Sequence, residues 1–284
     1  MRFVRFSSPE GVRTGVVIGE GVLDLVQAGS ALTSIEAIIA GGARALEAIA
    51  DLAASVQPQL ALGELHLHAP VAPSKYLAIG MNYRAHAEEA AALGFEEPKK
   101  QLWFNKQISC LSGPNDDIDP GVTEQLDYEV ELGVVIAAKA KSVSRDDAAR
   151  HIFGYVVVND VSARDWQFHS PTFTIGKSFD THGPVGPWLV TADEIPDPHA
   201  LEMRCLVNGA VRQSANTSQM IHDIYDQIAY LSTAFTLEPG DLIATGTPGG
   251  VGLSHKPPLF LAPGDLVRCE IDAIGAISNR VAAG

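Results

Sequence analysis

Two glutamates two residues apart, Glu129 and Glu131, mark the stretch of the chain best suited to chemistry. They stand in residues 127–136 (DYEVELGVVI), where apolar residues alternate with acids before the run becomes wholly apolar. This pattern predicts a buried β-strand, on which side chains two apart point to the same face. Neighbouring carboxylates at the mouth of an apolar strand repel each other and lose hydration. The pair therefore requires protonation, surrounding basic side chains or a bound divalent cation.

A third carboxylate, Asp160, follows a predicted buried strand at residues 154–158. Three carboxylates that converge at strand ends form an all-oxygen site suited to Mg²⁺, Mn²⁺ or Ca²⁺. The alternative is that each acid has its own basic partner, with Arg145, Arg150 and Arg164 as candidates. Asp127 shares the parity of the two glutamates but lies nearer the strand start, where a ligand and a solvent-exposed residue both fit the pattern.

His86 and Glu89 lie three residues apart in a helix predicted over residues 83–93, with Asn82 as its N-cap. Residues at this spacing share a helix face and can touch. A carboxylate bonded to one imidazole nitrogen orients the ring and raises its basicity, so that the other nitrogen can take a proton from water. The alternative is an ordinary surface pair, of which helices carry many.

Lys177 stands in a glycine-flanked segment, residues 175–181 (IGKSFDT). A lysine here could neutralise an enolate or a substrate carboxylate, and it could equally be solvated. Residues 246–252 (GTPGGVG) follow a strand and are glycine-dense enough to bring backbone N–H groups close to an anion. They match neither the Walker pattern nor the dinucleotide fingerprint, so a nucleotide site is not favoured.

The elements that must position these residues are mostly short strands. Residues 1–26 predict small antiparallel strands, and residues 33–56 predict two helical stretches broken at Gly41-Gly42. A boundary near residue 70 divides a small N-terminal domain (1–70) from the main domain (71–284). Residues 201–213 predict a hairpin through Asn208-Gly209, and residues 217–235 predict an amphipathic helix whose apolar stripe packs in the core. These elements together predict a β-rich domain with a few covering helices.

Composition and charge limit the classes of function. The chain has 284 residues, 46% of them hydrophobic and 19% charged, which is typical of a globular protein. Its net charge of −14 argues against nucleic-acid or anionic-membrane partners. The three cysteines (Cys110, Cys205 and Cys269) lie far apart and are expected to be reduced core thiols. No signal peptide and no membrane span is predicted, so we expect a cytoplasmic location.

The order of the motifs is more specific than any one of them. Six motifs together resemble the fumarylacetoacetate hydrolase family, from about residue 71 to the C-terminus. They are residues 80–83 (GMNY) with His86 and Glu89, Gly113-Pro114, residues 127–132 (DYEVEL), residues 159–165 (NDVSARD), residues 176–181 (GKSFDT) and residues 246–248 (GTP). The resemblance is closest to the short members, which include acylpyruvate hydrolases, oxaloacetate decarboxylases and tautomerases, and sugar-derived diketo-acid hydrolases. The first 70 residues resemble the family's variable leading domain only loosely.

The resemblance implies a fold class and a set of site residues. The fold would be α+β, a mixed β-roll with a small N-terminal α/β appendage. The site would hold Mg²⁺ or Mn²⁺ and bind a small 2-oxo acid, and the protein would be a homodimer. By motif position, the metal ligands would be Glu129, Glu131 and Asp160, the water-activating dyad His86 with Glu89, the enolate-stabilising group Lys177, and the substrate contacts Gln167, Lys177 and Thr247.

Hydrolysis of a carbon–carbon bond in a 2,4-dioxo acid, releasing pyruvate and a second acid, is the function that these roles favour. The same centre could instead decarboxylate or tautomerise oxaloacetate, which places less demand on the dyad. A non-catalytic metal-binding protein of the same fold is the rival from another class.

The segment between Gln167 and Lys177 is shorter than in many relatives, where it carries basic or aromatic residues over the substrate.

Overall fold

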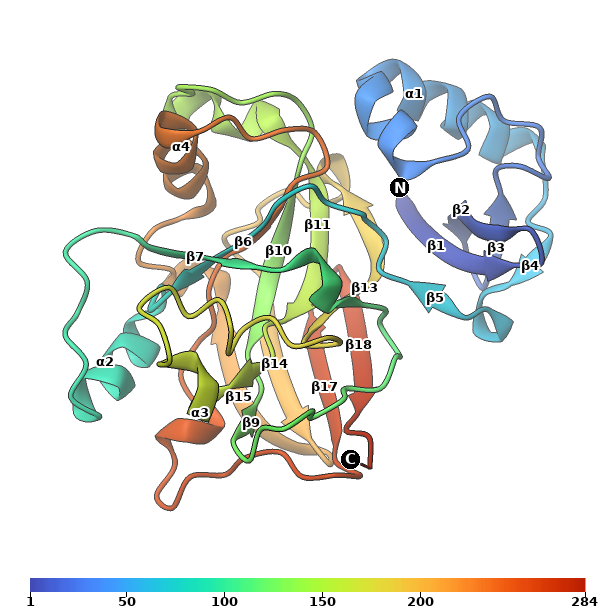
Figure 1. The fold of residues 1–284 in the computed structure, drawn as a ribbon. Helices are drawn as coiled ribbons and strands as arrows, with labels where there is room; N and C mark the ends of the chain where they lie inside the picture. The colour runs from blue at the N-terminus through green and yellow to red at the C-terminus, as the bar shows by residue number, and fades with distance from the viewer. Residues whose placement is uncertain (284) are drawn as a thin grey trace.

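A twelve-stranded mixed sheet forms the centre of the computed structural model, which describes residues 1–283 (Figure 1). Ten strands follow the order β4-β3-β2-β1-β13-β11-β10-β16-β6-β7, while β5 pairs with β1 and β8 with β13. Two pairs, β16 with β6 and β13 with β8, are parallel. The strands of this sheet are β1 (Arg2–Ser8), β2 (Gly11–Ile18), β3 (Gly21–Asp24), β4 (Leu60–Ala61), β5 (Leu67–His68), β6 (Tyr76–Gly80), β7 (Leu102–Lys106), β8 (Leu111–Ser112), β10 (Val130–Ile136), β11 (Ile152–Asn159), β13 (Gly183–Thr191) and β16 (Leu242–Ala244).

A second sheet of four strands and a two-stranded ladder complete the β-structure. The four-stranded sheet has the order β15-β14-β17-β18, with β14 (Glu202–Val207), β15 (Ala210–Asn216), β17 (Leu266–Ile271) and β18 (Gly275–Arg280). The ladder pairs β9 (Leu126–Asp127) with β12 (Ser162–Ala163). The helices are α1 (Ile35–Ser55), α2 (Arg84–Ala92), α3 (Arg164–Gln167) and α4 (Ile224–Ala234), with 3₁₀ turns η1 (Leu62–Glu64), η2 (Ile108–Cys110), η3 (Arg145–His151), η4 (Ala192–Glu194), η5 (Thr217–Gln219) and η6 (Gly252–Ser254).

β10 and β11 are buried on both faces, because their side chains alternate between two hydrophobic cores. Leu132 and Val134 of β10 face a core shared with the four-stranded sheet. Val135, together with Val156 and Val158 of β11, faces a core that includes the apolar stripe of α1. A strand buried on both faces favours a near-continuous apolar run, which residues 132–136 and 152–158 contain.

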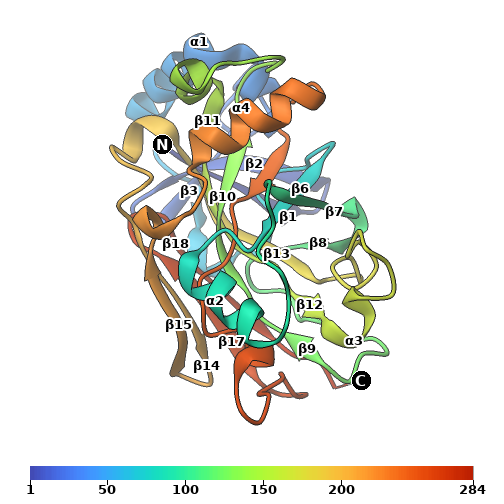
Figure 2. The ribbon, with the colours of Figure 1, turned by 90° about the vertical axis from the view of Figure 1, so that its left-hand side faces the viewer.

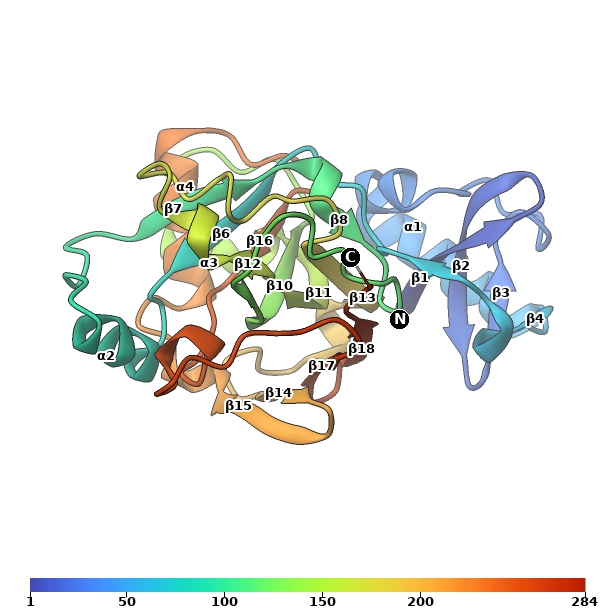
Figure 3. The same cartoon turned by 60° about the horizontal axis from the view of Figure 1, so that its bottom comes forward.

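The N-terminal segment forms a lobe at one side of the sheet, opposite the end that carries α2 and α3 (Figures 1 and 3). α1 is interrupted at Gly42, which has φ of 56°, so the predicted break between two helical stretches is confirmed. The lobe joins the main sheet through β1 and β13, where Phe3 lies opposite Leu189. The division of the chain into two domains near residue 70 stays a prediction.

Two predictions about helices are wrong. The helix predicted over residues 217–235 is confined to α4, because Asp223 accepts a hydrogen bond from the Asp226 amide and begins the helix there. Asn82 does not cap α2: its side chain donates to the Thr245 carbonyl and accepts from the His222 amide. The buried amide therefore ties the start of α2 to distant segments instead of capping it.

The predicted fold class, α+β with a mixed sheet and a small N-terminal appendage, is confirmed. Figure 2 shows α2 in front of the sheet and α4 above it. The predicted Asn208-Gly209 hairpin links β14 to β15, and the three cysteines are free and buried. Among residues 1–283, no helix has both the length and the apolar character needed to cross a bilayer.

Candidate metal and substrate site

Three carboxylates meet at one end of β10 and β11. Antiparallel pairing sets Val130 opposite Asn159, so the residues just outside this pair, Glu129 and Asp160, come together. The Asp160 amide donates to the Glu129 carbonyl at 2.9 Å, and this hydrogen bond holds the two residues side by side. Glu131 is two residues further along β10 on the same face. One carboxylate oxygen from each of the three acids lies within 4.8 Å of the others.

Buried cations surround two of these acids. Lys177 Nζ bridges them, at 2.6 Å from Glu129 Oε2 and 2.7 Å from Asp160 Oδ2. Arg164 donates to Glu129 Oε1 at 2.6 Å and to Asp127 Oδ2 at 2.8 Å. Burial acts to raise the pKa of Glu129, but Lys177 and Arg164 outweigh it and hold that pKa well below its usual range. Glu129 is therefore a stable carboxylate in this setting.

Lys106 is the third buried cation, at the end of β7. Its Nζ donates to Asp160 Oδ1 at 2.6 Å and also to the Lys177 carbonyl. Sequence reasoning missed this residue, although a signal was present. Lys106 stands two residues after Phe104 on the same strand, and both are buried, so the lysine shares the inward face.

Glu131 has no cation partner among the described residues. Three buried cations (Lys106, Arg164 and Lys177) face four buried carboxylates (Asp127, Glu129, Glu131 and Asp160), so one negative charge is uncompensated. Within residues 1–283, the hydrogen bond that Glu131 accepts comes from the Gly246 amide, at 2.8 Å. Burial and the neighbouring Asp160 and Glu129 raise the pKa of Glu131 well above its usual value. The carboxylates outnumber the cations and supply oxygen ligands, and both properties suit a divalent cation.

Basic partners, one of the two explanations that spacing left open, account for Glu129 and Asp160, whereas Glu131 has none among the described residues and fits the metal explanation. Arg164 is a basic partner, as one alternative proposed, whereas Arg145 and Arg150 pair with surface acids elsewhere. Asp127 lies outside the carboxylate cluster and is held by Arg164 and the amides of residues 252 and 253. It supports the site by holding Arg164 and the loop that follows Gly250.

The glycine-dense loop at residues 246–252 binds anions that belong to the protein itself. Its backbone N–H groups donate to three carboxylates: Gly246 to Glu131, Gly250 to Glu89 and Gly252 to Asp127. The residue types therefore do bring amides to anions, as expected, but the loop organises the site's own acids.

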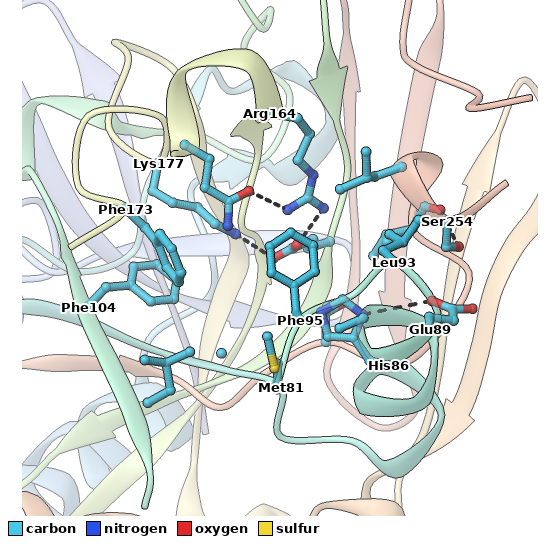
Figure 4. Close-up of a pocket in the computed structure, with 18 of the residues that line it drawn as sticks. Met81, His86, Glu89, Leu93, Phe95, Phe104, Arg164, Phe173, Lys177 and Ser254 are labelled. Atoms are coloured by element: carbon cyan, nitrogen blue, oxygen red, sulfur yellow. Dashed lines mark hydrogen bonds and ion pairs between the residues drawn. The ribbon is translucent and has the colours of Figure 1, made fainter. Parts of the chain in front are cut away.

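His86 and Glu89 lie on α2 and line a pocket whose wall also includes Glu129, Glu131 and Lys177 (Figure 4). His86 Nδ1 is 3.8 Å from Glu89 Oε2, which is ion-pair distance but longer than a hydrogen bond. Neither of these two buried atoms has a hydrogen-bond partner among the described residues. Burial acts to raise the pKa of Glu89, but His86 and the Gly250 amide outweigh it and lower that pKa. The two side chains therefore lie next to each other, and the lowered pKa favours the ionised form of Glu89.

The two remaining predicted contacts also line the pocket, and both already have protein partners. Gln167 Oε1 accepts from Arg164 at 2.9 Å. The Thr247 hydroxyl donates to the Val130 carbonyl and accepts from Gln213. All eight predicted site residues thus fall in or beside one pocket. Its lining comprises Ile79, Gly80, Met81, His86, Glu89, Ala90, Leu93, Phe95, Leu102, Phe104, Glu129, Glu131, Arg164, Gln167, Phe168, Phe173, Lys177, Thr247, Val251, Leu253 and Ser254.

Comparison with known proteins covers nearly the whole chain. Residues 75–282 match the family described as "Fumarylacetoacetate (FAA) hydrolase C-terminal". "Oxaloacetate tautomerase fahd2, mitochondrial" of Xenopus laevis is 42% identical over 290 residues, covering 99% of this chain and 90% of that protein. "Oxaloacetate tautomerase FAHD2A, mitochondrial" of Homo sapiens is 42% identical over 293 residues, with 99% and 91% covered.

Solved structures with similar folds agree. The fumarylacetoacetate hydrolase of Exiguobacterium antarcticum superposes with a TM-score of 0.82 at 34% identity, and both chains are covered completely. Maleylpyruvate hydrolase from Sphingobium sp. SYK-6, in complex with manganese(II) and pyruvate, gives a TM-score of 0.83 at 33% identity, again with 100% of each chain covered. The resemblance inferred from the motifs is confirmed, and this chain belongs to the fumarylacetoacetate hydrolase family.

Proposed function

We propose that this chain is a divalent-metal-dependent oxaloacetate keto–enol tautomerase. The observation that carries the proposal is the buried cluster of Glu129, Glu131 and Asp160, with Lys177 beside it, in a chain 42% identical to proteins named oxaloacetate tautomerases. Tautomerisation was the alternative in the sequence analysis, and the relatives favour it over the hydrolysis that was preferred there.

Glu129, Glu131 and Asp160 would hold Mg²⁺ or Mn²⁺. When bound, the cation would supply Lewis-acid polarisation of the 2-oxo acid unit. Lys177 is positioned to balance negative charge on the C2 oxygen of an enolate, since its ammonium is buried within the cluster. Burial acts to lower the pKa of Lys177, but Asp160 and Glu129 outweigh it and raise that pKa, so the charge is retained.

The His86–Glu89 pair would move the proton at C3. The imidazole Nε2 would take the C3 proton, while Glu89, 3.8 Å from Nδ1, would stabilise the imidazolium. The proton added to the C2 oxygen completes the enol, and the reverse transfers return the keto form. The fixed cations and amides around the site need no reorganisation during this charge movement.

The test is to add enol-form oxaloacetate to Mg²⁺-loaded or Mn²⁺-loaded protein and follow loss of the enol absorbance. We expect acceleration over the same buffer with metal alone, abolition by chelator, and a loss of about 10²-fold or more in His86→Gln. Pyruvate and carbon dioxide as products would instead identify a decarboxylase. A rate equal to that of metal-containing buffer would overturn the proposal.

Hydrolysis of a 2,4-dioxo acid is the second candidate. The His86–Glu89 pair supports it, because a base beside a carboxylate cluster could activate water, and maleylpyruvate hydrolase is a structural neighbour. Release of pyruvate and a second acid from an acylpyruvate would support this function. If His86→Gln lost that cleavage but kept oxaloacetate tautomerisation, the dyad would serve hydrolysis alone.

The homodimeric state and cytoplasmic location expected from the sequence also stay proposals. Light scattering of the purified protein would measure the first, and fractionation of the source cells the second. The relatives described above are named mitochondrial.

A further inference from the structure

Four phenylalanine side chains that line the pocket, Phe95, Phe168, Phe173 and Phe104, contact one another in series. Figure 4 labels three of them, Phe95, Phe173 and Phe104. Phe95 stacks on Phe168 with centroids 5.2 Å apart, Phe168 meets the edge of Phe173 at 5.7 Å, and Phe173 meets Phe104 at 6.1 Å. Lys177 Nζ lies 5.1 Å from the centroid of Phe104. The row therefore begins at the ammonium beside the carboxylate cluster and runs outward.

The far end of this row is apolar and open. Phe95 is 36% exposed and Phe168 is 48% exposed, whereas Phe104 is buried. Leu93, also exposed, lines the pocket beside them. The charged residues that line the pocket are those already described: His86, Glu89, Glu129, Glu131, Arg164 and Lys177. No additional cation among the described lining residues could pair with a second substrate carboxylate at the outer end.

The exposed rings come from two segments that meet over the pocket. Phe95 follows α2 and Phe168 follows α3, so the stacked pair joins two chain segments beside the opening. Aromatic rings leave water favourably when another ring packs against them, at centroid separations of about 4.5–7 Å. A planar apolar group that entered here would bury both exposed faces.

We propose that the pocket also catalyses keto–enol exchange of arylpyruvates, that is, 2-oxo acids with an aromatic ring on C3. The inference rests on the proposed function, because the reacting unit is the same. The proton leaves C3 and a proton is added to the C2 oxygen, so the atoms balance and no co-reactant is consumed. The 2-oxo acid end takes the position that oxaloacetate would use, and the ring extends along the phenylalanine row.

The substrate chemistry fits this wall. The pocket lining continues from Glu129, Glu131 and Lys177 to Phe95 and Phe168, so apolar wall lies beyond the carboxylate cluster. A ring on C3 is conjugated with the enol double bond, so the enol is planar and can lie against a flat aromatic surface. Oxaloacetate has a carboxylate at that place, which gains nothing from apolar contact.

The experiment compares phenylpyruvate with oxaloacetate on Mn²⁺-loaded protein, following each enol by absorbance in borate-free buffer. We expect both to be accelerated, with competition between them. Turnover of oxaloacetate without turnover or competition by phenylpyruvate overturns this inference and leaves the proposed function standing. Turnover of phenylpyruvate alone supports the inference and overturns the proposed function. If neither is accelerated over buffer with metal alone, the inference and the proposed function are both overturned.

Variants locate the ring. Phe168→Ser and Phe95→Ser should lower the ratio of phenylpyruvate to oxaloacetate kcat/KM by about tenfold, the value of one aromatic contact. Phe235→Ser is the matched control, since Phe235 is also 36% exposed and does not line this pocket. Its ratio should equal that of the wild type. An unchanged ratio in both pocket variants would place the ring elsewhere and overturn the inference.

Discussion

Lys106 Nζ lies 2.6 Å from Asp160 Oδ1, and neither side chain reaches solvent. The lysine also donates to the main-chain carbonyls of Val161 and Lys177, so its three N–H donors are all used. One side chain thereby joins β7 to two segments that supply site residues. The arrangement holds one oxygen of Asp160 in place independently of any bound metal.

Replacing Lys106 by methionine should destabilise the metal-free protein by about 3–5 kcal/mol, because Asp160 loses a buried partner. Urea unfolding measures the change. Lys139→Met is the control: Lys139 pairs with Glu238 at the exposed surface, and its loss should change stability by less than about 1 kcal/mol. Mn²⁺ should raise the Tm of Lys106→Met more than that of the wild type. Equal stability of Lys106→Met and wild type without metal would contradict this account.

Glu131→Gln and Glu129→Gln should separate stability from metal binding. Glu131 lacks a cation partner, so Glu131→Gln should not destabilise the metal-free protein, whereas Glu129→Gln should, because it weakens contacts with Arg164 and Lys177. Both should weaken Mn²⁺ binding by more than about tenfold, since each removes a charged oxygen ligand. Calorimetric titration and urea unfolding measure the two quantities. Wild-type Mn²⁺ affinity in both variants would refute the ligand assignment.

Gly176→Ala should damage the site through the backbone. A Cβ at residue 176 would lie 2.3 Å from the Gln167 nitrogen, and Gly176 accepts a hydrogen bond from Ala163 at 2.7 Å. The segment before Lys177 would have to move, at a cost of about 1–3 kcal/mol, and the tautomerase rate should fall with it. Gly63→Ala, where a Cβ meets nothing within 4 Å, is the control and should match the wild type in both measurements.

His182 should make stability depend on pH. Burial, reinforced by Lys106, lowers the pKa of His182 from 6.5 to about 4, while its Nε2 lies 2.9 Å from the Asp119 carbonyl. A lowered histidine pKa means that the unfolded chain binds the proton more readily. This contribution to stability is therefore complete above pH 6.5 and is lost as the pH falls toward 4.

The wild type should lose about 3 kcal/mol more than His182→Gln between about pH 7.5 and about pH 4, because glutamine does not titrate. Urea unfolding at a series of pH values measures both proteins. Parallel curves would show that His182 does not carry this dependence.

Patterns confined to one strand predicted structure well. The apolar run after Glu131 predicted a strand buried on both faces, and the parity of Glu129 and Glu131 placed them together. Position-by-position patterns succeed here because side-chain direction on a strand depends only on parity. Asp160 was also predicted from a pattern within one strand, because it is a carboxylate directly after an apolar run.

Features that depend on several segments were missed. The apolar stripe of residues 217–235 suggested one helix, but α4 covers only part of it. Met220 lies before α4 and forms an isolated antiparallel β-bridge with Tyr83. Asn82 resembled a cap, but its partners are residues 222 and 245. Lys106 and the phenylalanine row acquire their roles only when β7, α2 and α3 surround the pocket. Local propensity does not contain these long-range contacts.

The pairing of β1 with β13 bears on truncation. Val190 and Leu189 of β13 are covered at their hydrogen-bonding edge by Arg2 and Phe3. A chain that began at residue 71, where the sequence suggests a boundary, would retain every candidate metal ligand. It would also expose an apolar strand edge, a template for intermolecular pairing. Shortening this protein to its family-matched core would thus create an exposed strand edge and favour aggregation.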